Sequence, residues 1–167
     1  VTAPFETFGT LAESYRRIHE TIAEALRTLG FPAGLASPPG RASALDAGAC
    51  FASPAGGEVM LPGGKVVGSA QLREGGAFLQ HGSILLSGSQ QLVSDLTLGA
   101  PPPDGSIALS TVRSAPVPFD EVARAFAEAA RAWAPEPWAD EYDPEALHEA
   151  TVRHAERFRG TDWTWRR

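Results

Sequence analysis

The sequence predicts an α/β fold, with a mixed, largely antiparallel sheet flanked by helices. Apolar residues recur at helical spacing over residues 11–29. Short strand-like runs separated by glycine turns fill residues 49–86, and two further helical patterns lie within 118–159. Hydrophobic residues make up 43% of the 167 residues and charged residues 20%, which is typical of a globular protein. We therefore expect a single domain over residues 1–167.

The predicted first helix has both a period and a stop signal. Its apolar positions lie three or four residues apart, and Gly30 follows where a C-cap glycine belongs, with Pro32 beyond it. Residues 1–10 lack any periodicity, and residues 33–48 are rich in proline, glycine and serine, which predicts a loop. The apolar positions of this helix are Tyr15, Ile18, Ile22, Leu26 and Leu29.

The strand-rich segment is expected to form one β-meander. Two turn sequences, Pro62-Gly63-Gly64 and Glu74-Gly75-Gly76, separate three runs with strand character. The strands are predicted at residues 58–61, 65–72 and 77–86.

Helices are predicted to dominate the rest of the chain. Residues 90–98 could form a short helix, and residues 119–133 an amphipathic one with Val122, Phe126 and Trp133 on one face. Asp143-Pro144 has the pattern of an N-cap followed by a first-turn proline, which predicts a third helix to about Phe158 that Gly160 ends.

Composition also limits the possible partners. The net charge of −6 disfavours nonspecific nucleic-acid binding, and no apolar run approaches the ~18 residues of a membrane helix. A single cysteine favours a reducing compartment, so we expect a cytoplasmic protein. The helical histidines His19, His148 and His154 show no paired ligand spacing, and we assign no metal site.

Lysine use singles out one residue. Of 14 basic residues, 13 are arginine, and Lys65 is the only lysine. Arginine replaces lysine readily on a solvated surface, but not where a compact ammonium is needed. The only cysteine, Cys50, lies 15 residues before Lys65. These two residues are therefore candidates for chemistry, although their proximity alone proves little.

A longer pattern surrounds Lys65. The run GGKVVGSAQ (63–71) is followed by LQHGSILL (79–86), and Cys50-Phe51 precedes both. This ordered set resembles the biotin/lipoate protein ligase superfamily, nearest to the lipoate–protein ligases and the cysteine-dependent octanoyl transferases. Looser similarity at Ser14-Tyr15-Arg16 and at 162–166 extends the resemblance over nearly the whole chain.

The resemblance implies a function: transfer of an octanoyl or lipoyl group to a specific lysine of lipoyl-domain proteins. Lys65 would contact the acyl carbonyl and stabilise the negative charge that develops there. Cys50 would take octanoyl from acyl carrier protein as a thioester, and a nearby ammonium would favour its thiolate. An ATP-dependent ligase that uses free lipoate would not need Cys50. No tightly bound cofactor is expected; ATP would be required only by the ligase.

The resemblance also implies a set of substrate-binding residues, each with a structural alternative. Polar members could donate hydrogen bonds to a ligand or be satisfied within the sheet, and the glycines could admit a ligand or mark bulges. His81 could act as a base, but a structural role in its strand is the stronger interpretation. The set is Gly68, Ser69, Ala70, Gln71, His81 and Gly82.

One departure from the family leaves alternatives open. Family members carry an Arg-Arg-x-x-Gly-Gly motif before the Ser-Tyr helix, and this chain begins after that point. We therefore expect a fold incomplete at its N-terminus, inactive and only marginally stable by itself. A non-catalytic remnant or partner subunit that binds an acyl group or a lipoyl domain is an alternative. A biotin–protein ligase is a weaker one.

Overall fold

The computed structural model describes residues 1–37, 56–96, 104–133 and 143–164. The chain divides into two compact units, Val1–Trp133 and Ala134–Arg167, and each is described by itself. The expectation of one domain over residues 1–167 stays a prediction. In the described part of the chain, no helix is both long enough and apolar enough to cross a membrane.

Helix α1 (Leu11–Thr28) begins and ends where its sequence predicts. The Thr10 side chain accepts a hydrogen bond from the Glu13 N–H, and the Glu13 carboxylate accepts one from the Thr10 N–H at 2.8 Å. This reciprocal capping satisfies two N–H groups that the first turn leaves without helical partners. At the other end, Gly30 adopts a φ of 86°, a conformation that favours glycine.

The strands of the first unit form two three-stranded antiparallel sheets. One has the order β1-β6-β5, with strands Thr2–Pro4, Ala77–Ile84 and Val67–Glu74. The other has the order β2-β3-β4, with strands Gly34–Leu35, Val59–Leu61 and Gly64–Lys65.

The prediction of one meander is therefore wrong at its centre. The strand expected over 65–72 is broken, because β4 ends at Lys65 and β5 begins at Val67. Between them, the Val66 N–H donates to the Val59 carbonyl at 3.2 Å, and the Val66 carbonyl accepts from the Leu85 N–H at 3.0 Å. Val66 thus bonds to β3 of one sheet and to Leu85, the residue directly after β6 of the other.

The first ten residues are also more regular than their pattern predicts. They contain β1 and the 3-10 helix η1 (Phe5–Thr7). Strand β1 is only three residues long and pairs with β6, where Thr2 lies opposite Leu79. A strand this short has no room for a visible alternation, which explains why the residue pattern did not predict it.

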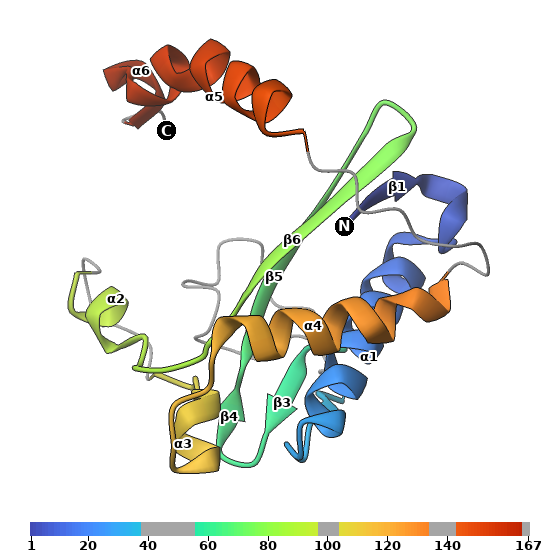
Figure 1. Cartoon of the computed structure of the whole chain (residues 1–167), viewed down its shortest axis with the longest axis vertical. Coiled ribbons are helices and arrows are strands. Elements are labelled where there is room, and N and C mark those ends of the chain that lie inside the picture. Colours follow the sequence, from blue (N-terminus) through green and yellow to red (C-terminus); the bar gives the residue numbers. More distant parts are fainter. Residues whose placement is uncertain (38–55, 97–103, 134–142, 165–167) are drawn as a thin grey trace. The chain divides into compact units, whose positions relative to one another are not determined.

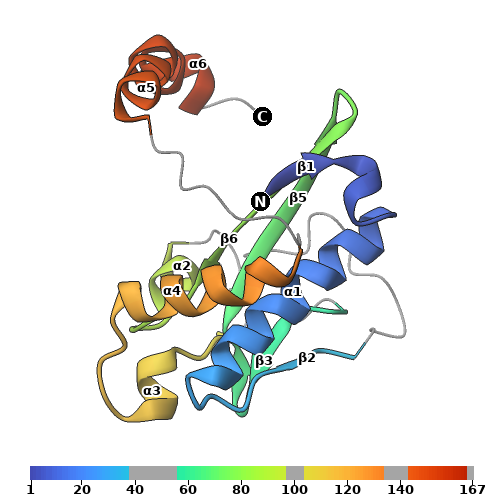
Figure 2. The ribbon, with the colours of Figure 1, turned by 45° about the vertical axis from the view of Figure 1, so that its right-hand side comes forward.

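The core of this unit lies between the helices and the β5–β6 hairpin. Figures 1 and 2 show α1 and α4 (Phe119–Ala130) side by side over one face of that hairpin. As predicted, Val122, Phe126 and Trp133 share the inner side of the later helix, which continues as the 3-10 helix η2 (Arg131–Trp133). Two shorter helices complete the unit, α2 (Gln91–Asp95) and α3 (Leu109–Arg113); the second was not predicted.

The β5–β6 pairing excludes one of the two interpretations of Gly82, the bulge. Its register runs without interruption from Val67↔Ile84 to Glu74↔Ala77, so there is no bulge. A Cβ on Gly82 would lie 2.7 Å from the Ser69 Cβ and 2.8 Å from the Gly68 carbonyl oxygen. Glycine is therefore required here by the neighbouring strand itself.

The second unit consists of α5 (Pro144–Arg159) and α6 (Thr161–Thr164). As predicted, Asp143 is the N-cap: its carboxylate accepts from the N–H groups of Glu145 and Ala146, both at 3.0 Å. Gly160 is the C-cap. Phe158 and Trp163 meet edge to face at 4.6 Å between ring centroids, which joins the two helices.

Candidate functional site

Lys65 lies in β4 and is buried, with 3% of its side chain exposed. Its Nζ lies 2.7 Å from Oε1 of Glu58, whose side chain is 6% exposed. Lysine is almost never buried to this extent without a paired charge. The only lysine of the chain is therefore not a surface residue, and Glu58 holds its ammonium.

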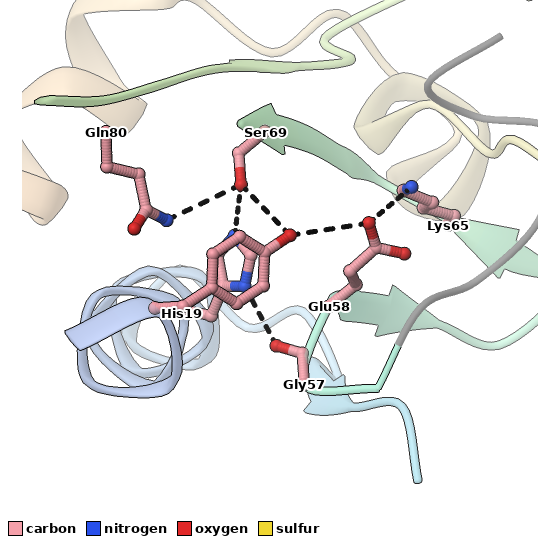
Figure 3. A network of polar contacts seen from close by, with 7 residues as sticks. His19, Gly57, Glu58, Lys65, Ser69 and Gln80 are labelled. Atoms are coloured by element: carbon pink, nitrogen blue, oxygen red, sulfur yellow. Dashed lines mark hydrogen bonds and ion pairs between the residues drawn. The ribbon is translucent and has the colours of Figure 1, made fainter. Parts of the chain in front are cut away.

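A chain of polar contacts leads from this ion pair to helix α1. The Tyr15 hydroxyl lies 3.5 Å from the Glu58 carboxylate and 3.3 Å from Ser69 Oγ. Ser69 Oγ lies 2.7 Å from Nε2 of His19, and Gln80 Nε2 approaches it at 3.5 Å. Figure 3 shows the labelled side chains converging from α1, from β4, β5 and β6, and from the residue directly before β3. We call Lys65, Glu58, Tyr15, Ser69 and His19 the buried polar network.

The contacts of His19 define its tautomer. Nδ1 lies 2.9 Å from the carbonyl oxygen of Gly57, which can only accept, so Nδ1 carries a proton. Burial lowers the pKa of His19 below its ordinary value. The hydrogen bond to Gly57 and the charge of Glu58 oppose that effect, whereas the charge of Lys65 adds to it. A neutral His19 then accepts a hydrogen bond from the Ser69 hydroxyl at Nε2.

This pKa predicts a loss of stability in acid. Because the unfolded chain binds a proton at His19 more tightly than the folded protein does, the free energy of unfolding falls as the pH drops below about 6.5. The melting temperature should therefore fall more for the wild type than for His19→Gln between about pH 7.5 and about pH 5.5. The exposed His81 offers a matched control, since His81→Gln should follow the wild type. Equal falls for the wild type and His19→Gln would contradict the prediction.

Gln71 belongs to a second group of contacts beside the network. Its Nε2 donates to Gln80 Oε1 at 2.9 Å and to Ser14 Oγ at 3.1 Å, and Arg73 donates to its Oε1 at 3.2 Å. Ser69 and Gln71, both predicted to bind substrate, thus already have hydrogen-bond partners within the protein. Their role towards a ligand stays a prediction.

The predicted substrate-binding residues do not all face the same way. Successive strand residues point to opposite faces of a sheet, and Ser69 and Gln71 contact α1. Ala70 and His81 are partners in the β5–β6 register, and both are exposed on the other face. The structure therefore brings Lys65 and Ser69 into one network and leaves His81 outside it.

An apolar cavity of about 600 Å³ runs along β6. Its wall includes three of the predicted substrate-binding residues, Ser69, His81 and Gly82. The remaining lining is mainly apolar and comes from α1, α4 and the β5–β6 hairpin, together with Val1 and Leu86. Lys65 does not line it, but Ser69 belongs both to the cavity wall and to the buried polar network.

Cys50, the predicted nucleophile, lies outside the described residues.

The sequence did not indicate Glu58, Tyr15 or His19 as parts of a site. Their contacts join residues that are 43 to 54 positions apart in the sequence, and no local pattern predicts such contacts.

Comparison with solved structures identifies the fold. The structure of "lipoate-protein ligase A bound with ATP" matches with a TM-score of 0.72 at 16% identity, over 97% of this chain and 62% of that one. Protein Ta0514 from T. acidophilum with bound lipoic acid matches with a TM-score of 0.66 at 16% identity, over 92% and 58%. The predicted α/β fold class is confirmed.

The chain belongs to the lipoyl protein ligase A/B catalytic domain family, whose model matches residues 2–131. It is 50% identical to octanoyltransferase LipM of Kyrpidia tusciae over 82 residues, which are 47% of this chain and 30% of that protein. It is 32% identical to LipM of Halalkalibacterium halodurans over 133 residues, 71% of this chain and 48% of that one. The chain thus spans about a third to a half of the length of these relatives.

Proposed function

We propose that the protein transfers an octanoyl group to a specific lysine of lipoyl-domain proteins. The observation that carries this proposal is the 50% identity to an octanoyltransferase over 82 residues. The proposed donor of the octanoyl group is octanoyl-acyl carrier protein. The proposed reaction uses no tightly bound cofactor. A cytoplasmic location is part of the same proposal and rests on the use of a single cysteine.

The proposed reaction has two steps. First, the Cys50 thiolate attacks the thioester carbonyl of the donor, the carrier leaves as its thiolate, and octanoyl-Cys50 forms. Next, the target lysine amine attacks this new thioester, an amide forms, and the amine proton passes to the departing Cys50 thiolate. In each step, negative charge develops on the carbonyl oxygen, where the Lys65 ammonium would stabilise it.

Two features of the structure support these roles. A buried ammonium acts in a medium of low dielectric constant, so its field on a carbonyl oxygen is stronger than at a solvated surface. The apolar cavity along β6 could take the hydrocarbon tail. Ser69, shared by cavity and network, would link the place of the tail to the place of the carbonyl.

The experiment uses the full-length protein as its gene encodes it. Incubation with octanoyl-acyl carrier protein should add an octanoyl group to Cys50, seen by intact-protein mass spectrometry and removed by hydroxylamine. Cys50→Ala should accept no octanoyl group and should not octanoylate a lipoyl domain. Full activity of Cys50→Ala that requires ATP and free octanoate or lipoate would instead assign the ATP-dependent ligase reaction.

A further inference from the structure

We propose that Glu58 is a positioning residue, which holds the Lys65 ammonium in place for acyl transfer, and that His19 in turn holds Glu58. This inference rests on the role proposed for Lys65. It assigns a task to two residues that have no step of their own in the proposed reaction.

The hairpin of β3 and β4 brings Glu58 and Lys65 together. Met60 lies opposite Lys65 in the β3–β4 register, and Glu58 precedes Met60 by two residues. In an extended chain, Glu58 and Met60 share a face, so Glu58 is the diagonal neighbour of Lys65. The two side chains meet at 2.7 Å and are almost completely buried.

A lysine side chain needs such a partner to hold its ammonium at one point. Its four-carbon stem has many rotamers, and an ammonium has no directional plane of its own. A buried carboxylate removes that freedom, because moving the ammonium away from the carboxylate would separate two charges in a medium of low dielectric constant. Glu58 therefore determines where the positive charge of Lys65 lies.

His19 fixes Glu58 by two routes. It is completely buried, and its Nδ1–H donates to the carbonyl of Gly57, the residue directly before Glu58. Its Nε2 accepts from Ser69, which approaches the Tyr15 hydroxyl, and this hydroxyl approaches the Glu58 carboxylate. One side chain of α1 thus contacts both the backbone before Glu58 and the polar chain that reaches its carboxylate (Figure 3).

The first test replaces Glu58 in the full-length protein. Glu58→Gln keeps the shape and removes the charge, and should lower kcat about 10²-fold with little change in the KM for the lipoyl domain. Glu58→Asp keeps the charge and should restore part of that loss. Glu24→Gln, which changes an exposed glutamate of α1, should have wild-type kinetics. The folded fraction of each variant is measured by circular dichroism at the assay temperature.

The second test separates positioning from general stability. If Glu58 acts through Lys65, Glu58→Gln should have no further effect on the residual activity of Lys65→Met. A purely structural Glu58 would lower kcat equally in both backgrounds and would overturn the proposal. His19→Gln should lower kcat less than Glu58→Gln, and it too should have no effect in the Lys65→Met background.

The outcomes also separate this inference from the proposed function. Wild-type turnover of Lys65→Met would refute the role of Lys65 in the reaction. A strongly impaired Lys65→Met together with a folded, fully active Glu58→Gln would refute the positioning role alone.

Discussion

Replacing Lys65 with arginine is expected to lower kcat for octanoyl transfer by about 10²–10³-fold, although the positive charge is kept. The side chain is buried and its ammonium lies 2.7 Å from the Glu58 carboxylate. A guanidinium is broader than an ammonium and directs its donors in one plane, so it cannot occupy the same point. The loss would be seen in steady-state octanoylation of a lipoyl domain.

The matched control is Arg16→Lys, the reverse exchange at an exposed position of α1, where 71% of the side chain is accessible. This variant should retain wild-type kcat, because either cation can pair with Glu20 in water. If Lys65→Arg also retained wild-type turnover, the role proposed for the Lys65 ammonium would be wrong.

The second large effect concerns stability. Lys65→Met and Glu58→Leu are each expected to lower the free energy of unfolding by about 3–5 kcal/mol, because each removes the ion-pair partner of a buried charge. The double variant removes both charges, and apolar side chains replace them. It should therefore be more stable than either single variant. Urea denaturation of the four proteins measures this difference.

An exposed ion pair provides the comparison. Arg16 and Glu20 lie one helical turn apart with 71% and 44% of their side chains accessible, so Arg16→Ala should cost less than about 1 kcal/mol. A double variant that lost the sum of both single losses would show that Lys65 and Glu58 do not stabilise each other.

Local signals predicted the longer helices well. The N-cap Asp143 with Pro144, and the C-cap region at Gly30, act within a few residues, so the sequence itself contains both partners of each interaction. The strands were harder, because a strand needs a partner that the local sequence does not specify. Thr2 pairs with Leu79, and the sequence near either residue does not predict this pairing.

The break at Val66 has the same origin. Residues 65–72 carry uniform strand character, and only the positions of β3 and β6 decide that Lys65 pairs in one sheet and Val67 in the other. Periodicity within a segment cannot report such a division. The predicted meander failed for this reason.

The candidate site was predictable in part. The lysine count and the surrounding motif singled out Lys65, whose burial and ion pair the structure then revealed. Glu58 and His19 have no such signal, because a glutamate before a strand and a histidine on a helix are both ordinary. Their importance comes from tertiary packing, which brings α1 to within hydrogen-bond distance of β5.

The contact between α1 and β5 has a consequence for the order of folding. The β5–β6 hairpin joins residues close in sequence and can close early, whereas α1 must dock across about 50 residues before His19 reaches Ser69. Lys65 therefore gains its fixed place only after that slower docking step. A partly folded chain that kept the hairpin but had released α1 would still protect the amides of β5 and β6 from hydrogen exchange, and yet it would have no assembled acyl-transfer site.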